Sequence, residues 1–455
     1  MTSLLALGGG LLFVAWLLYR DVRGRPAVSP ASWIVVVWVV IYSSRPVMSW
    51  FADPSAAVSP ESYDEGDLRE ALVSLAVIVA SLIVLLRRGA RLQQIIDQNK
   101  WLAVVYVFWL HSILWSDYPI ITAKRLFKDI GNVAMVLMVL TDQNSVEAMK
   151  AICARCVYIG IPLSLVLIRY FPELGRAYTG YNQDQLSVVG ITANKNMLGM
   201  LALVTVIFML WDFLDSRRTH RHSTDWANMG ARAAVLLMAW YLLIISDSAT
   251  SLVCAVGGSV LLFVLDLPYF KRRPGRFEVW GISVMVLLWA VNAGLGLHEA
   301  FVQSLGRNMS LTTRTDMWPV LFRLQENPLL GAGFDTFWAG ERLVQSARAL
   351  GGLFLQAHNG YLETYLNGGA IGVGLLIVLL CVSYRRIRGE LMRGTVDARF
   401  RLAILLVAIV HNFTEATFYK LSVVWFVTVF AIMDYRPRAL DKGNLKPLQA
   451  TTARS

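Results

Sequence analysis

Long apolar runs alternate with short polar stretches along almost the whole chain. A transmembrane helix needs about 20 mostly apolar residues, and runs of about 17 to 25 such residues number about thirteen here, some of them short. The pattern therefore predicts an all-α polytopic membrane protein with about 12–14 transmembrane helices. The apolar runs begin near Thr2, Ser32, Glu70, Trp101, Arg125, Met149, Asn196, Arg232, Ala249, Val279, Leu362, Phe400 and Leu421.

One polar stretch is much longer than the others and precedes the last two or three spans. Its sequence predicts ordered short helices packed on the membrane face. Apolar residues recur at helical spacing in 313–326, and 341–350 looks like a second short helix. Asn327-Pro328 ends the first of these helices, since the residue before a proline is pushed out of the α region. The expected division of the chain is residues 1–298 for spans one to ten, 299–360 for the polar loop, 361–435 for the remaining spans and 436–455 for a tail.

Composition supports a membrane protein and argues against several other classes. The 455 residues are 56% hydrophobic and only 16% charged, whereas a soluble protein carries about a quarter charged residues. The net charge of +11 comes without a continuous basic arm, so no nucleic-acid partner is expected. Cys153 and Cys156 form a CxxC on a predicted span, and with no second pair to complete a zinc site the cysteines are expected to be small apolar residues.

Lys and Arg gather in alternate loops between the apolar runs. The positive-inside rule places these loops and the C-terminal tail in the cytoplasm, so the long polar loop faces the periplasm. The first run has no basic stretch or small-residue cleavage site before it, and we therefore expect it to be a span, not a removed signal peptide.

A second group of cations is expected at the periplasmic ends of the spans, where the topology rule predicts few. Converging Arg and Lys side chains can hold a phosphate or diphosphate; contact with lipid headgroups is the alternative for any one of them. The group comprises Arg45, Lys124, Arg125, Lys128, Arg169, Arg176, Lys195, Arg307, Arg314 and Lys420.

His358 is the strongest candidate for a general base. A histidine imidazole, with an ordinary pKa of about 6.5, can accept a proton from a substrate hydroxyl near neutral pH. Asn359 follows it at the start of an apolar run. His411 begins a second His-Asn pair and Glu415 lies one turn later, where it can orient a catalytic group, pair with a cation or make a structural contact between helices. The chain contains no DxD, HExxH, Walker or GxSxG motif.

Three pieces of the sequence resemble the bacterial O-antigen ligase and Wzy-type polysaccharide polymerase family. The first is the series Arg314–Trp318, Asn327-Pro328, Gly331-x-Gly333, His358-Asn359 and Gly369-x-x-Gly372. The second is GITANKNMLG before the seventh span, and the third is SDSATSLV at a tight turn. The second and third pieces look closest to members that polymerise exopolysaccharide.

The resemblance implies a membrane glycosyltransferase of the bacterial inner membrane that acts on undecaprenyl-diphosphate-linked oligosaccharides at the periplasmic face. It implies neither a metal ion nor a cofactor. His358 matches the base of the family and Arg314 its loop arginine, which would hold the diphosphate; Arg45, Arg125, Lys195, Asn359, His411 and Glu415 are the other expected substrate-binding residues.

Three readings of the function remain open at this point. The first is a polymerase that joins lipid-linked repeat units, with a glycan acceptor, membrane lipid and a chain-length regulator protein as partners. The second is a ligase that transfers glycan to lipid A core. The third is a transporter, which should show paired broken helices in two related halves.

Overall fold

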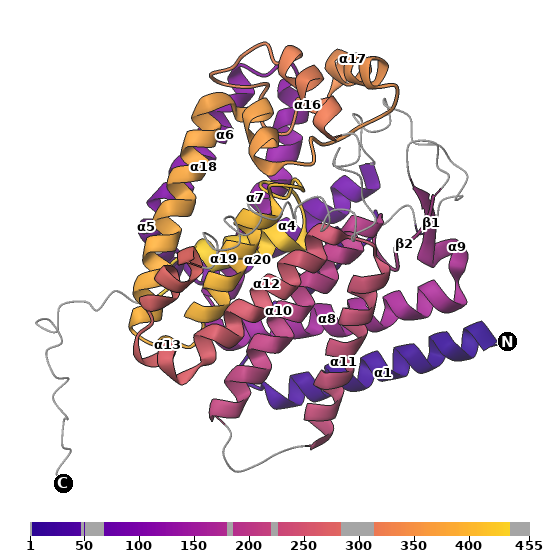
Figure 1. Cartoon of the computed structure of the whole chain (residues 1–455), viewed down its shortest axis with the longest axis vertical. Helices are drawn as coiled ribbons and strands as arrows, with labels where there is room; N and C mark the ends of the chain where they lie inside the picture. The colour runs from indigo at the N-terminus through magenta and orange to yellow at the C-terminus, as the bar shows by residue number, and fades with distance from the viewer. Residues whose placement is uncertain are drawn as a thin grey trace, which may run out of the picture.

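The computed structural model describes residues 2–46, 50, 68–179, 185–219, 226–283 and 314–436, which fold into one bundle of helices (Figure 1). The helices are α1 (Thr2–Gly24), α2 (Ser32–Ser43), α4 (Leu68–Arg87), α5 (Gly89–Gln98), α6 (Lys100–His111), α7 (Pro119–Leu140), α8 (Ser145–Tyr170), α9 (Pro172–Gly175), α10 (Lys195–Thr219), α11 (Trp226–Ile245), α12 (Ala249–Asp266), α13 (Pro268–Arg272), α16 (Arg314–Arg323), α17 (Gly340–Leu350), α18 (Gly360–Met392), α19 (Ala398–His411) and α20 (Val423–Ile432).

The predicted fold class, an all-α polytopic membrane protein, is confirmed. Six described helices are long and apolar enough to cross a membrane, namely α1, α4, α8, α10, α12 and α18. In their most apolar windows, α10 is 89% buried and α8 is 78% buried, whereas α1 is only 11% buried. Helices α8 and α10 therefore form the centre of the bundle, and α1 lies at its edge with most of its surface available to lipid. The total of 12–14 spans stays a prediction, because the run that begins near Val279 extends beyond the described residues.

Two details differ from the sequence-based expectation. A short hairpin of β1 (Arg176–Thr179) and β2 (Gln185–Val188) pairs antiparallel, with Arg176 opposite Val188; strands of four residues are too short to show a period-two pattern. Helix α7 begins at Pro119, well before the expected Arg125, because proline is pre-organised for the first helical position and needs no hydrogen bond there.

The polar loop forms helices, as expected, and these have a hydrophobic core of their own. Helices α16 and α17 lie together at one end of the bundle, beside the ends of α6 and α18 (Figure 1). Buried apolar side chains join them to α18, among them Met317, Leu321, Trp338, Leu343 and Leu366. The loop is thus packed onto the bundle as a layer.

Helix α18 is interrupted at Gly369, whose φ of 59° and ψ of −162° are not helical. In an unbroken helix the N–H of Ala370 would bond to the carbonyl of Leu366, and that of Ile371 to the carbonyl of Asn367. The break separates these two donors from their acceptors. Four backbone groups therefore need other partners, and lipid offers none.

The segment 328–333 supplies all four partners. The bonds run from Ala370 N to Pro328 O (2.9 Å), Ile371 N to Leu329 O (3.2 Å), Ala332 N to Leu366 O (3.0 Å) and Gly333 N to Asn367 O (2.9 Å). This approach requires glycine at two positions: a Cβ on Gly331 would lie 2.3 Å from the backbone carbon of Asn367, and one on Gly369 would lie 2.2 Å from that of Leu329. The loop is therefore joined to the break in α18 by backbone contacts.

We expect Gly331→Ala to lower the melting temperature of the detergent-solubilised protein. Gly331 has a φ of 71°, a region that costs a residue with a Cβ about 1–2 kcal/mol, and the backbone clash adds to this. Gly374→Ala is the matched control, because Gly374 lies in α18 with nothing within 4 Å of an added Cβ and alanine is the better helix former. Equal melting temperatures for the two variants would contradict the proposed role of the loop contact.

Candidate functional site

The N-cap of α18 fixes the position of His358. Asn359 is the N-cap of α18: its side-chain oxygen accepts hydrogen bonds from the N–H groups of Tyr361 and Leu362, both at 3.0 Å, and its amide donates to the carbonyl of Phe413 at 3.2 Å. The structure thus gives Asn359, which was expected to bind substrate, a capping role. His358 lies just outside the helix, with a φ of 49°.

The start of α18 is also fastened to the turn that follows α19. The N–H of Gly360 donates to the carbonyls of Asn412 (2.8 Å) and Glu415 (2.9 Å). A Cβ on Gly360 would lie 2.0 Å from the side-chain oxygen of Asn412, so only glycine permits this contact. Two segments far apart in the sequence are therefore held at backbone distance.

His358, Glu415 and Asn196 form a chain of polar contacts across three segments. His358 Nδ1 lies 3.4 Å from Glu415 Oε2, and Glu415 Oε1 accepts a hydrogen bond from Asn196 Nδ2 at 3.1 Å. The Glu415 side chain is 3% exposed, whereas that of His358 is 24% exposed. A buried carboxylate thus faces one ring nitrogen of a partly accessible imidazole.

This arrangement can prepare His358 to act as a base. An ionised carboxylate only accepts hydrogen bonds, so His358 must donate from Nδ1, and Nε2 is left with its lone pair. Proteins use the same device where an acidic side chain fixes the tautomer and orientation of a catalytic histidine. The distance of 3.4 Å is long for a hydrogen bond, as is common for catalytic contacts before substrate binds.

A second buried carboxylate, Glu363, lies one turn into α18. It accepts hydrogen bonds from Trp338 Nε1 and from the N–H of Ala357, both at 2.9 Å. Lys420 Nζ lies 3.1 Å from Glu363 and also pairs with Asp335. The bond to Ala357 constrains the residue immediately before His358, so Glu363 supports the site from the loop side.

Two of the expected substrate-binding cations lie at backbone carbonyls. Arg125, on α7, donates to the carbonyl of Asp335 at 2.5 Å, which brings it to the same loop residue as Lys420. Arg45, just after α2, donates to the carbonyls of Leu174 and Gly190. Burial lowers the pKa of the Arg45 guanidinium below its ordinary value. Arg125 therefore lies beside the group that surrounds Glu363, whereas Arg45 contacts residues on either side of the β1–β2 hairpin.

The described residues among the remaining expected ones lie at the same end of the bundle. Lys195 pairs with Asp247 at 3.0 Å in an exposed contact. His411 is the last residue of α19 and is fully buried, so it does not face an open space as His358 does. Arg314 is the first residue of α16, but its side chain lies outside the described part, and Arg307 lies outside it altogether.

Residues 233–377 match the family model described as O-antigen ligase. The resemblance to this family is confirmed over that segment. No curated protein matches the chain. The matched segment, about a third of the chain, contains His358, the loop 328–333 and the break in α18. It supports an enzyme of the O-antigen ligase and polymerase type, which works with lipid-linked glycans in a membrane.

Residues with strained backbone gather around His358 and Glu363. In the described part of the chain, the non-glycine residues with positive φ are Asp247, Asp335, His358 and Tyr419. Each costs of order 1–3 kcal/mol and persists only where the surrounding structure enforces it, typically at functional sites. Three of these residues belong to the groups that surround Glu363 and Glu415, which supports the assignment of the site.

Sequence reasoning did not find Asp335, Trp338 or the pairing of Lys420. One signal was available for Asp335, since it follows Gly331-Ala-Gly333-Phe and aspartate is one of the few residues that tolerate positive φ. Only the fold brings these side chains to Glu363.

We expect the Glu415 carboxylate to hold neutral His358 in the Nδ1–H tautomer. Nitrogen-15 NMR of histidine-labelled protein in detergent, at a pH where the imidazole is neutral, should show a protonated Nδ1 and an unprotonated Nε2. Glu415→Leu removes the acceptor, so the spectrum should shift towards the Nε2–H form. An unchanged tautomer in that variant would show that Glu415 does not orient the ring.

Proposed function

We propose that this chain is a glycosyltransferase that joins undecaprenyl-diphosphate-linked repeat units into exopolysaccharide or O-antigen at the periplasmic face of the bacterial inner membrane. The contact of His358 with buried Glu415, supported by Asn196, is the observation that carries this proposal. It supplies a base with a fixed orientation at one end of a membrane bundle, within a chain that contains an O-antigen ligase segment.

The proposed reaction is a single displacement at the anomeric carbon of the donor chain. The hydroxyl oxygen of the acceptor sugar forms the new glycosidic bond while its proton passes to Nε2 of His358. The bond between the anomeric carbon and the diphosphate oxygen breaks, and its electron pair leaves with undecaprenyl diphosphate. Attack opposite the leaving group inverts the configuration at the anomeric carbon. Glu415 stabilises the imidazolium that forms.

Three cations at the same end of the bundle as His358, namely Arg125, Lys420 and Arg314, are proposed to hold the leaving diphosphate. Arg125 and Lys420 both contact Asp335, so α7 and the turn before α20 bring two positive charges to one loop. Arg314 begins the helix α16 that packs on the same layer, and the family resemblance assigns it this role. Positive charge placed where negative charge develops lowers the barrier to departure of the leaving group.

The proposed membrane orientation rests on how the charged contacts are divided. The contacts of His358, Arg125, Lys195 and Lys420 lie at one end of the bundle, and the ion pairs of Arg88, Lys150, Arg399, Arg401 and Arg436 lie at the other. The second end carries the loops rich in Lys and Arg, which the positive-inside rule assigns to the cytoplasm. His358 would then face the periplasm.

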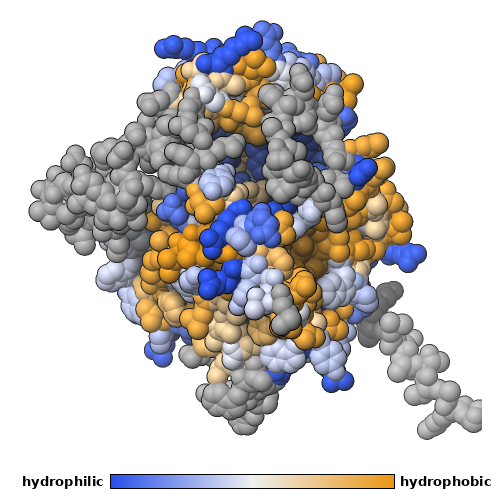
Figure 2. Space-filling view, turned by 90° about the vertical axis from the view of Figure 1, so that its right-hand side faces the viewer, coloured by the Kyte–Doolittle hydropathy of each residue, from blue (hydrophilic) through white to orange (hydrophobic). Residues whose placement is uncertain are grey.

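The surface also suits a substrate with a lipid tail. On the side where α9 and the β1–β2 hairpin lie in Figure 1, hydrophilic side chains gather near the middle of the surface, with hydrophobic ones beside them (Figure 2). A diphosphate could contact such a polar patch while its polyprenyl chain stays against apolar helix surface.

A ligase that transfers glycan to lipid A core is the alternative, and the description of the matched family favours it. The two activities share donor chemistry and differ in the acceptor. The third reading, a transporter, receives less support. Within the described helices one interruption with non-helical backbone is seen, at Gly369, and loop backbone fills it, whereas transporters use paired breaks that line a binding site.

We expect His358→Asn to reduce glycosyl transfer by about 10²–10⁴-fold, the usual contribution of general base catalysis. Asparagine tolerates positive φ, so this variant removes the imidazole and keeps the backbone. Purified protein is mixed with a lipid-linked repeat unit, and the products are resolved by size. His111→Asn is the control. His111 is exposed at the C-terminal end of α6, at the same end of the bundle as His358, and this variant should retain full activity.

The same assay separates the two enzyme readings. A polymerase forms a ladder of lengthening lipid-linked chains from the repeat unit alone, whereas a ligase forms product only when lipid A core is added. Full activity of His358→Asn with either acceptor would refute the assignment of the base.

A further inference from the structure

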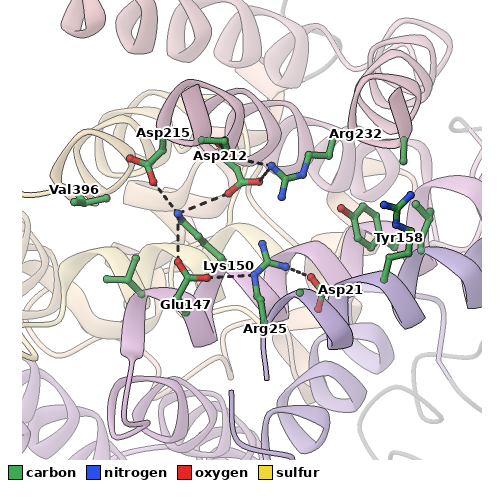
Figure 3. Close-up of a pocket in the computed structure, with 15 residues that line it drawn as sticks. Asp21, Arg25, Glu147, Lys150, Tyr158, Asp212, Asp215, Arg232 and Val396 are labelled. Carbon is green, nitrogen blue, oxygen red and sulfur yellow. Dashed lines mark hydrogen bonds and ion pairs between the residues drawn. The ribbon is translucent and has the colours of Figure 1, made fainter. Parts of the chain in front are cut away.

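A cavity of about 430 Å³ lies at the end of the bundle opposite His358. Side chains of α1, α8, α10 and α11 line it (Figure 3). Helix α10 connects the two ends: Asn196 lies in its first turn and Asp212 in its second half, and at a rise of about 1.5 Å per residue they are separated by about 24 Å. The cavity is therefore separate from the proposed catalytic site.

Charged side chains of both signs alternate around this cavity. Lys150 lies at the centre of the group: its Nζ is 2.8 Å from Asp215, 3.6 Å from Glu147 and 3.8 Å from Asp212. Figure 3 shows Lys150 pointing at these three carboxylates, with Arg232 beyond Asp212 and Arg25 beside Glu147. Arg232 pairs with Asp212 at 3.2 Å, and Arg25 pairs with Glu147 at 3.4 Å.

The two signs balance among the residues that line the cavity. The lining includes four basic residues (Arg20, Arg25, Lys150 and Arg232) and four acidic ones (Asp21, Glu147, Asp212 and Asp215). A ligand with a single charge would gain one set of contacts and repel the other. A ligand with a positive and a negative group can satisfy both sets.

Burying these charges beside a cavity costs free energy of folding. The side chains of Lys150, Asp212 and Asp215 are only 10%, 6% and 5% exposed, and a buried ion pair is seldom more stable than apolar packing of the same volume. Ionisable residues in a membrane protein usually face a cavity that serves a function. The network is therefore better explained by a ligand than by the stability of the bundle.

The neighbouring part of α1 places the cavity at the depth of lipid headgroups. The guanidinium of Arg20 lies 5.1 Å from the ring centre of Trp16, and that of Arg23 lies 4.8 Å from the ring centre of Tyr19. Trp and Tyr with adjacent cations mark the boundary between hydrocarbon and water. The most apolar part of α1 is only 11% buried, so a lipid can lie beside the cavity with its chains in the bilayer.

We propose that this cavity binds the phosphoethanolamine headgroup of a membrane lipid. The phosphate lies between Arg25 and Arg232, which can donate in pairs to its oxygens. The ammonium group lies against Asp212 and Asp215 beside Lys150. A phosphocholine headgroup has no N–H to donate, and a phosphoglycerol headgroup has no cation, so neither satisfies both sets.

Native mass spectrometry of the full-length protein in detergent tests this proposal. Equal amounts of phosphatidylethanolamine, phosphatidylcholine and phosphatidylglycerol, with matched acyl chains, are added in competition. We expect at least about tenfold preference for phosphatidylethanolamine, about 1.4 kcal/mol. Arg232→Gln, at a side chain that is 30% exposed and therefore tolerant of change, should abolish most of that preference.

Arg88→Gln is the matched control, since Arg88 pairs with Asp142 at the same end of the bundle and does not line the cavity. It should keep the preference. The proposal is overturned if the wild-type protein prefers phosphatidylglycerol or no lipid, or if Arg232→Gln and Arg88→Gln behave alike. Equal competition by soluble glycerophosphoethanolamine would overturn the lipid part of the proposal.

Discussion

The packing of the polar loop on the bundle depends on the break in α18 at Gly369. The break leaves four backbone groups without helical partners, and the segment 328–333 forms a hydrogen bond with each of them. A backbone donor or acceptor left without a partner in lipid costs several kcal/mol, so the break can exist only while the loop stays in place. The loop in turn can approach only because Gly331 and Gly369 have no side chain. The segment 328–333 of the polar loop thus completes the backbone hydrogen bonding of α18.

The position of His358 follows from this constraint. The loop layer delivers the chain to the start of α18, where Asn359 caps the helix and Gly360 is bonded to the turn of residues 412–415. Glu415 then meets His358 across a boundary between two segments, and the positive φ of His358 is maintained by contacts on both sides. A rigid support of this kind is what a catalytic base needs, because small displacements of a base reduce its effectiveness.

Much of this was predictable from the sequence, and the failures have physical causes. Apolar runs predicted the helices. The first helix of the polar loop was expected to end at Asn327-Pro328, whereas α16 already ends at Arg323. Gly331 and Gly333 belong to the series that resembles the ligase family, but their contact with α18 depends on packing between distant segments. Glu415 was expected to orient a catalytic group, pair with a cation or make a structural contact, and only the fold showed that it faces His358. The local sequence gave a signal for the backbone of Asp335 but none for its contacts with Arg125 and Lys420, which depend on the fold.

The most direct test of the account is a double-mutant cycle in glycosyl transfer between His358 and Glu415. If Glu415 acts by orienting His358, Glu415→Gln should slow the wild-type protein about 10–100-fold, as loss of such a supporting group commonly does. In the His358→Asn background the same change should slow the residual reaction less than about twofold, since groups that act as a unit are not additive. An equal factor in both backgrounds would show that the two residues act independently and would contradict the central claim.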